Sequence, residues 1–290
     1  MHDVISLAYL GFRGDTSAWR TFAVDVHGMH PVMDGNILRL RMDGKAWRIQ
    51  VDPEGKPGCA FVGFEWETPA KLDAVIARAK AAGYDIVEDP ELASKRQVRR
   101  LARLVGPGNL NCEFCFGQIG TSLPFCSATG ATFVTGGLGM GHIGLIAADA
   151  EAACVFFQDV MGLRLTDSVL SIRRAGAIVT FMRGSSRHHL VVVVPGTEQT
   201  QGLDHFYAEV DQISTLGRAW DKVSGGAAPV FLTLGQHSND PAVSYYCVSP
   251  SGINFEYGWN SLMLDDEKWK PLFLTGGDHW GHQRRPAPGA

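Results

Sequence analysis

The sequence lacks the features that would place it in a membrane, on nucleic acid or outside the cell. No apolar run approaches the roughly 20 residues that a membrane-spanning helix needs. Lys and Arg number 26 against 30 Asp and Glu, and this net charge of −4 is unlike the basic, clustered surface of a nucleic-acid-binding protein. Met1, His2 and Asp3 do not form the basic start of a signal peptide. We therefore expect a cytoplasmic protein that binds neither membranes nor nucleic acid.

Cysteine is also scarce. Six cysteines are scattered through 290 residues, which is typical of free, buried thiols in a reducing compartment. Cys112 and Cys115 form a CxxC pair, for which zinc binding or redox exchange is the alternative. No second CxxC follows, and the pair lies in a strand-like segment instead of a tight knuckle. The sequence therefore favours free thiols.

What the sequence does contain is a repeat. Four short amphipathic helical patterns recur, each with a polar cap at its start and a glycine at its end. The expected caps are Thr16 or Ser17, Thr68, Asp149 and a residue near Asp211; the closing glycines are Gly28, Gly83, Gly162 and Gly225. The first and third glycines are 134 residues apart, and the second and fourth are 142 apart. The chain therefore reads as two copies of a half that itself holds two units.

Strand-like runs surround these helical patterns. One run precedes each helix and about three follow it, so the expected fold is α+β, built from four βαβββ modules. Two modules form each domain, and their sheets curl around a cavity and so hide strand edges. The small-residue stretch 127–137 reads as the linker. We expect a non-catalytic repeat over 1–132 and a catalytic, metal-binding repeat over 133–290.

Two similar segments carry an ionisable residue in apolar surroundings. "GINFEYGW", residues 252–259, contains Glu256, and "LNCEFCFG", residues 110–117, contains Glu113 at the same place. A buried carboxylate is costly unless a charge, a set of donors or a metal compensates it. Both glutamates therefore need an explanation.

The positions of the histidines explain the buried glutamate of the second half only. Aligned by repeat, His142 and His205 open the first strands of the third and fourth modules, and Glu256 lies in the last strand. The first half has Tyr9, Phe61 and Glu113 in the matching places. Two histidines and one carboxylate form the facial triad of non-haem Fe(II) oxygenases, which leaves positions open for substrate and O₂. Glu113 would then be a relic or a structural polar residue, because no histidines accompany it. The alternative is that His142 and His205 are ordinary strand histidines.

Several ordered blocks resemble the type I extradiol ring-cleavage dioxygenases of the vicinal oxygen chelate superfamily, above all those acting on 2,3-dihydroxybiphenyl and 1,2-dihydroxynaphthalene. The blocks are "LAYLGF", "AWRTF", "GLGMGHIGL", "FFQDVMGLRL", "RHH", "LDHFYAEV", "GQHSNDPAVSYYCVSPSG", "NFEYGW" and "HWGH". The resemblance implies an Fe(II) enzyme that opens an apolar bicyclic or aryl-substituted catechol with O₂, with an inactive first half and a homo-octameric assembly. Mn(II) is an alternative metal, because oxygen and nitrogen ligands accept both ions.

The resemblance also implies roles for individual residues. His142, His205 and Glu256 match the iron ligands, and His189 matches an acid–base histidine that takes a proton from the catechol. His237 and Tyr246 match residues that hydrogen-bond the substrate hydroxyls, with Asn239 and Asp240 beside them. Phe181 matches a pocket wall. His188 is expected to point away from the site as a structural residue.

Gly144 is the notable departure. Enzymes of the biphenyl type often carry a larger apolar residue there, so its missing side chain predicts a roomy, apolar pocket beside the metal.

Two other functions compete with this one. "GMGHIG", residues 139–144, matches the letters of a GxGxxG dinucleotide motif, but a helix should follow it at once and "LIAA" intervenes. A non-oxygenase of the same superfamily, such as a metal-dependent lyase or an aromatic-binding protein, is the closer alternative. The joint presence of His189, His237 and Tyr246 favours the dioxygenase.

Overall fold

The computed structural model describes residues 4–171 and 176–285. Within them, two sheets follow one another along the chain. The first half contributes β1 (Ile5–Arg13), β2 (His30–Asp34), β3 (Ile37–Arg41), β4 (Ile49–Asp52), β5 (Gly58–Trp66), β6 (Val87–Glu88), β7 (Arg100–Val105) and β8 (Asn111–Phe116). These eight strands pair in the order β2-β3-β4-β1-β5-β8-β7-β6. The order places the first strands of the two modules, β1 and β5, side by side at the centre.

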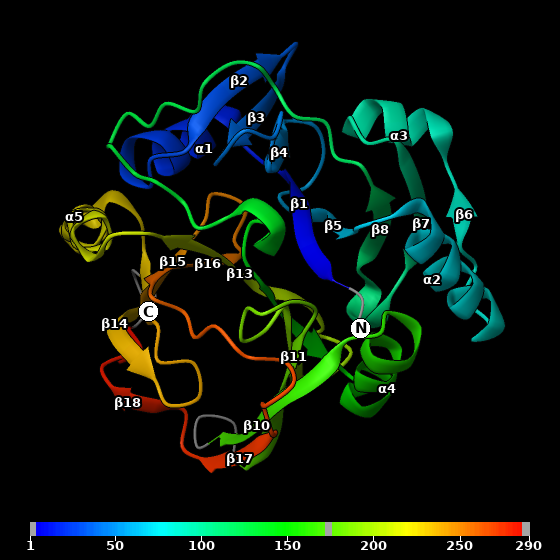
Figure 1. Ribbon diagram of the computed structural model, residues 1–290. Coiled ribbons are helices and arrows are strands. Elements are labelled where there is room, and N and C mark those ends of the chain that lie inside the picture. The colour runs from blue at the N-terminus through cyan, green and yellow to red at the C-terminus, as the bar shows by residue number, and fades with distance from the viewer. Residues whose placement is uncertain (1–3, 172–175, 286–290) are drawn as a thin grey trace.

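The second sheet repeats this plan and extends it. Its strands are β9 (Ile143–Ala147), β10 (Arg164–Ser171), β11 (Ala177–Arg183), β12 (Val191–Pro195), β13 (Gly202–Val210), β14 (Val230–His237), β15 (Val243–Val248), β16 (Asn254–Trp259), β17 (Leu272–Thr275) and β18 (Asp278–Trp280). They pair in the order β17-β10-β11-β12-β9-β13-β16-β15-β14-β18. The last two strands come from the C-terminal segment and cover the two sheet edges, which the repeat pattern did not predict. Figure 1 shows the blue-to-cyan half above the green-to-red half.

The helices lie at the outside of the molecule (Figure 1). They are α1 (Thr16–Arg20) continued by η1 (Thr21–Val26), α2 (Pro69–Ala81), α3 (Pro90–Arg96), α4 (Ala150–Val155) continued by η4 (Phe156–Val160), and α5 (Ile213–Lys222) continued by η6 (Val223–Ala227). Short 3₁₀ turns, η2 (Pro107–Asn109) and η3 (Gly136–Leu138), complete the set. With one main helix in each of four strand–helix–three-strand units, the α+β fold of βαβββ modules is confirmed.

The cap of the first helix differs from the prediction. Thr68 and Asp149 cap α2 and α4 as expected, each accepting a backbone N–H of the first turn. The cap of α1 is Asp15, not Thr16 or Ser17, because its carboxylate accepts two backbone N–H groups at 2.7 and 3.1 Å.

Helix α3 was not predicted. It is only seven residues long, and its signal is local: Asp89 caps it and Pro90 is its first residue. It matters for the first half because it ends at Arg96, whose guanidinium reaches Glu113.

Strand register aligns the halves residue by residue. Leu10 pairs with Ile49 in the parallel contact of β1 and β4, as Ile143 pairs with Val191 in that of β9 and β12. Tyr9 directly precedes Leu10, and His142 directly precedes Ile143, so Tyr9 and His142 occupy equivalent positions in the two halves. Likewise, Gly63 pairs with Glu113 in the register of β5 and β8, as Tyr207 pairs with Glu256 in that of β13 and β16. Phe61 and His205 each lie two residues before these positions and are therefore counterparts. The repeat alignment made from the sequence is confirmed at all three positions.

The two halves share one hydrophobic core. The Phe12 ring lies 5.0 Å from the Phe206 ring, and Trp19 donates its indole N–H to Ser251 Oγ at 2.7 Å. The buried His27 contacts the hydroxyl of Tyr245 at 3.1 Å. The first half therefore packs as part of the same body as the second. In the described residues, no helix is long and apolar enough to span a bilayer.

Candidate metal and active site

Three neighbouring strands bring the predicted metal ligands together. His142 immediately precedes β9, His205 lies on β13 and Glu256 lies on β16, and β13 runs between the other two strands. All three side chains are buried, and their ligand atoms lie within 4.8 Å of one another. His142 Nε2 is 3.1 Å and His205 Nε2 is 3.8 Å from Glu256 Oε2. Two imidazoles and one carboxylate at this spacing fit a divalent cation with open positions.

The surroundings prepare these groups as ligands. Ser244 donates its hydroxyl to Glu256 Oε1 at 2.7 Å, and Asp204 lies 2.9 Å from Nδ1 of His205. Burial lowers the pKa of His142 to about 4, so its imidazole is neutral at pH 7. Burial alone would raise the pKa of Glu256, but hydrogen bonds to His142 and His237 outweigh it and bring the pKa well below its usual range. His142 and Glu256 therefore stand in the neutral and anionic states, respectively, that bind metals.

A cavity of about 120 Å³ opens beside the three ligands. Its far wall is apolar and includes Val179, Phe181 and Val192. Besides Phe181, the polar or ionisable residues predicted to contact substrate also line it: His189, His237, Asn239, Asp240 and Tyr246. The expectation of a roomy pocket is wrong, since the volume lies below the roughly 300–1,000 Å³ of ordinary ligand sites. The cavity is close in size to the roughly 150 Å³ that accommodates one benzene ring.

His237 and Tyr246 form a polar pair on the cavity wall. His237 Nε2 lies 2.9 Å from the Tyr246 hydroxyl, and its Nδ1 lies 2.8 Å from Asp278. Burial opposes a charged imidazole here, but Asp278 and Glu256 outweigh it and raise the pKa of His237 to about 10. The pair therefore presents a cationic donor and a phenol where a catechol oxygen would develop negative charge.

Asn239 and Asp240 are buried beside this pair. The Nδ2 donor of Asn239 has no hydrogen-bond partner among the described residues, although it lines the cavity. Asp240 accepts from the Leu262 backbone at 2.8 Å and lies 3.7 Å from His189 Nδ1. An orphaned buried donor is costly unless a ligand or a water satisfies it. Asn239 is thus suited to contact a bound molecule.

His188 differs in part from its prediction. It does not line the cavity, as expected, but it is not detached from the site. Its Nδ1 lies 3.0 Å from Nδ1 of His189, and its Nε2 lies 2.7 Å from Asp167. The two histidines are therefore in direct hydrogen-bond contact. Alternation along a strand failed here because 188 and 189 precede β12, which begins at Val191.

The comparisons with known proteins agree with this geometry. Residues 139–257 match the family described as Glyoxalase/Bleomycin resistance protein/Dioxygenase superfamily, and residues 7–53 match Dihydroxybiphenyl dioxygenase BphC D1. A biphenyl-2,3-diol 1,2-dioxygenase of Metapseudomonas furukawaii is 32% identical over 288 residues, which cover 96% of this chain and 93% of that one. The chain belongs to the extradiol ring-cleavage dioxygenases. An iron-dependent extradiol dioxygenase of Rhodococcus jostii (strain RHA1) is 31% identical, with 96% of each chain covered.

A solved structure supports the same family. The crystal structure of BphC, a halotolerant catechol dioxygenase, matches with a TM-score of 0.91 and 29% identity, covering 99% of this chain and 98% of that one. The dioxygenase is thus similar to that structure in both of its halves.

The interpretation of Gly144 needs correction. Gly144 does not line the cavity of the dioxygenase. A Cβ placed there would meet Cε1 and Nδ1 of His205 at 2.2 Å. The missing side chain therefore makes room for the imidazole of His205, a predicted metal ligand, and not for substrate. Because Gly144 itself lies in β9 (Ile143–Ala147), the GxGxxG letters of 139–144 run into a strand and lack the helix that a dinucleotide site needs.

This correction leads to a testable expectation. Gly144→Ala should push the His205 ring out of place and weaken metal binding, whatever the size of the substrate. Gly11→Ala is a matched control, because a Cβ at Gly11 would meet the Phe61 ring at 2.1 Å in the equivalent place of the first half. Metal content per chain after anaerobic Fe(II) loading should fall for Gly144→Ala only. Full metal content in Gly144→Ala would show that His205 can shift freely.

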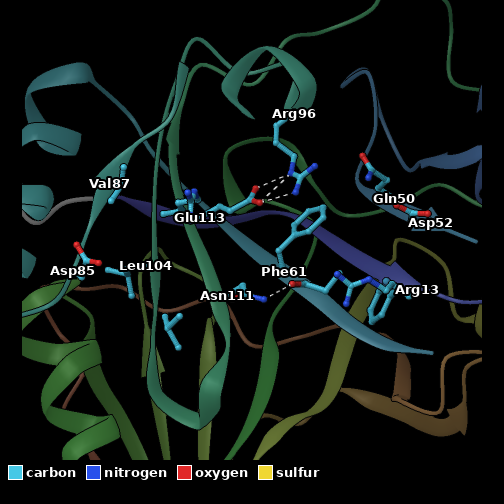
Figure 2. A pocket seen from close by; sticks show the side chains of 14 residues that line it. Arg13, Gln50, Asp52, Phe61, Asp85, Val87, Arg96, Leu104, Asn111 and Glu113 are labelled. Atoms are coloured by element: carbon cyan, nitrogen blue, oxygen red, sulfur yellow. Dashed lines mark hydrogen bonds and ion pairs between the residues drawn. The ribbon is translucent and has the colours of Figure 1, made fainter. Parts of the chain in front are cut away.

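The first half contains the structural counterpart of this site, in which an arginine lies beside the glutamate (Figure 2). Arg96 forms hydrogen bonds to both oxygens of Glu113 at 2.8–3.0 Å, and Tyr9 donates to Glu113 at 2.9 Å. The guanidinium also lies 3.5 Å from the centre of the Phe61 ring. The cation that compensates the buried carboxylate is therefore an arginine here.

The CxxC pair has no sign of a metal role. Cys112 and Cys115 are buried free thiols on β8, the strand that also bears Glu113. Burial raises the pKa of Cys112 to about 12, which disfavours the thiolate that zinc binding needs. Among the described residues, the clusters with metal-ligand spacing contain no cysteine.

Sequence reasoning missed several residues that support the site. Ser244, Asp278 and Asp167 hold Glu256, His237 and His188 respectively. His282, the last residue of "HWGH", is buried with Nδ1 2.7 Å from Asp278 and Nε2 3.2 Å from Ser244 Oγ. The "HWGH" block was the one available signal, since two histidines so near the end of the chain are unusual for a solvated tail.

Proposed function

We propose that this dioxygenase cleaves the ring of an aryl-substituted catechol between a hydroxyl-bearing carbon and the adjacent carbon that carries no hydroxyl. Fe(II) is held by His142, His205 and Glu256. The observation that carries the proposal is the set of three buried ligand atoms within 4.8 Å of one another, at the wall of a cavity lined by His189, His237 and Tyr246. When bound, Fe(II) supplies a site at which the catechol oxygens and O₂ meet and exchange electrons. Mn(II) suits the same donors and is the alternative metal.

The chain's own residues have separate tasks in this proposal. His189, buried and neutral, accepts a proton from one catechol hydroxyl. His237 and Tyr246 hydrogen-bond the oxygen that becomes negative, and Asn239 donates its free Nδ2 hydrogen toward the ring substituents. Phe181 and Val179 exclude water on the opposite side. We assign the catalytic repeat to residues 133–290 and a non-catalytic repeat to 1–132.

The substrate class rests on the apolar wall and on the relative named for biphenyl-2,3-diol. The cavity has room for about one ring, and a second ring would lie against the apolar side chains of its lining, such as Val179 and Phe181. Each Å² of apolar surface that the second ring removes from water contributes about 25 cal/mol. A 2,3-dihydroxybiphenyl should therefore be cleaved with a higher kcat/KM than catechol. A preference for catechol would restrict the proposal to single-ring substrates.

The reaction itself can be tested directly. Enzyme loaded anaerobically with Fe(II) is mixed with 2,3-dihydroxybiphenyl and then exposed to ¹⁸O₂. Extradiol cleavage yields a yellow product that contains both oxygen atoms of O₂. Binding without turnover would favour the non-oxygenase alternative, and a colourless diacid would indicate cleavage between the hydroxyls. Metal analysis of freshly purified protein separates Fe(II) from Mn(II), and sedimentation tests the octamer, which stays a prediction, as does a cytoplasmic location.

A further inference from the structure

A chain of three buried side chains leads from strand β10 to the cavity. Asp167 and His188 are fully buried, and His189 is 5% exposed. His188 Nε2 lies 2.7 Å from Asp167 Oδ2, and His188 Nδ1 lies 3.0 Å from His189 Nδ1. Only His189 reaches the cavity wall. The proposed reaction gives no role to Asp167 and His188. A carboxylate buried so close to the cavity is nevertheless costly, so its presence needs an explanation.

The direction of the hydrogen bonds follows from the Asp167 carboxylate. A carboxylate can only accept. Its Oδ1 accepts the backbone N–H of Leu272 at 2.9 Å, and its Oδ2 accepts from His188. His188 must therefore carry a proton on Nε2. A neutral His188 then presents a lone pair on Nδ1.

That lone pair determines the tautomer of His189. The contact between the two Nδ1 atoms needs one donor, and His188 has none left on that side, so His189 donates. Asp240 supports this arrangement, because its Oδ2 lies 3.7 Å from the same His189 Nδ1 and favours a hydrogen there. A neutral imidazole protonated on Nδ1 has its lone pair on Nε2, the nitrogen that remains for the cavity.

We propose that Asp167 and His188 are positioning residues that keep the proton of His189 on Nδ1 and so prepare Nε2 to accept the catechol proton. In that transfer the O–H bond breaks, the oxygen keeps the electron pair, and a new N–H bond forms on Nε2. The resulting imidazolium donates its Nδ1 hydrogen to His188, and the negative charge of Asp167 on the other side of His188 stabilises it. The proposal rests on the proposed role of His189 as proton acceptor.

An isosteric substitution of Asp167 should reverse the direction of the hydrogen bonds that link Asp167, His188 and His189. In Asp167→Asn, the amide oxygen has to stay at the Leu272 N–H, because two donors would otherwise face each other. The amide NH₂ then points at His188 Nε2, which must become an acceptor. His188 moves its proton to Nδ1 and donates to His189 Nδ1, so the proton of His189 shifts to Nε2. The same substitution in the Ser-His-Asp triad of serine proteases selects the wrong tautomer while preserving the geometry.

Two measurements test the proposal. The first needs no turnover: ¹H–¹⁵N correlation spectra of metal-free, ¹⁵N-histidine-labelled protein, with His189 assigned from a His189→Gln variant. Wild type should show His189 protonated on Nδ1, and Asp167→Asn should show it protonated on Nε2. The second is steady-state kinetics, in which Asp167→Asn should lower kcat by roughly 10²–10⁴-fold with little change in KM. Glu113→Gln, another buried carboxylate changed to an amide, should leave both unchanged.

The outcomes separate this proposal from the proposed function. If metal-free wild type carries the His189 proton on Nε2, the proposal is overturned even if Asp167→Asn fails to fold. If Asp167→Asn folds and turns over like wild type, it is overturned as well. If the tautomers are as expected but His189→Ala retains full turnover, the role of His189 fails instead, and with it any catalytic use of the chain.

Discussion

Glu256→Gln should no longer retain metal, with affinity falling by more than the roughly 10–100-fold that follows loss of a mere ligand-supporting contact. The change removes the one negative charge among the three ligands and replaces an oxygen anion with a neutral amide. His142 and His205 remain, but two imidazoles alone hold a hard divalent ion weakly. The measurement is metal per chain after anaerobic Fe(II) loading and desalting, with circular dichroism to check the fold.

The matched control is Glu113→Gln in the first half. Glu113 is equally buried, but its compensating cation is Arg96, at 2.8 Å. This variant should keep the metal content of wild type and lose stability instead, by about 3 kcal/mol, because one partner of a mostly buried ion pair loses its charge. Equal metal loss from both substitutions would mean that the metal is not confined to the second half.

His189→Ala should lower kcat by roughly 10²-fold or more at equal iron content. The catechol then has no buried base beside the cavity to take its proton. Burial lowers the pKa of His189 well below its usual range, and the neighbouring His142 and His188 lower it further, so the imidazole is neutral and ready to accept. Substrate should still bind anaerobically, because the metal ligands are intact.

The control for this variant is His30→Ala. His30 is a first-half histidine whose only role in the described structure is a 2.9 Å contact with the Cys126 carbonyl. It should turn over like wild type. Unchanged kcat in His189→Ala, with iron content measured in the same sample, would remove His189 from the mechanism.

The repeat made most of the fold predictable. Period-two runs and capped helices with closing glycines are local patterns, and their recurrence identified four modules. Helix α3 escaped because seven residues are too few to show a periodic stripe. Strands β17 and β18 escaped because they have no counterpart in the repeat and depend on the edges of a sheet that forms elsewhere.

That His142, His205 and Glu256 come together was predictable for the same reason, since the repeats place them against Tyr9, Phe61 and Glu113. What supports them was not. Arg96 reaches Glu113 from a helix seventeen residues earlier in the chain, and Asp167 meets His188 across 21 residues and a strand pair. Gly144 was misread because a glycine shows only that space is needed, not what fills it.

The shared core has a consequence for how such a chain can change over time. Phe12, Trp19 and His27 of the first half are packing partners of the second half. A chain that lost the first half would therefore expose an apolar face of the second half to water. A substitution at such a contact would then appear in a genetic screen as an enzyme defect, although the altered residue lies outside the cavity that we propose as the active site.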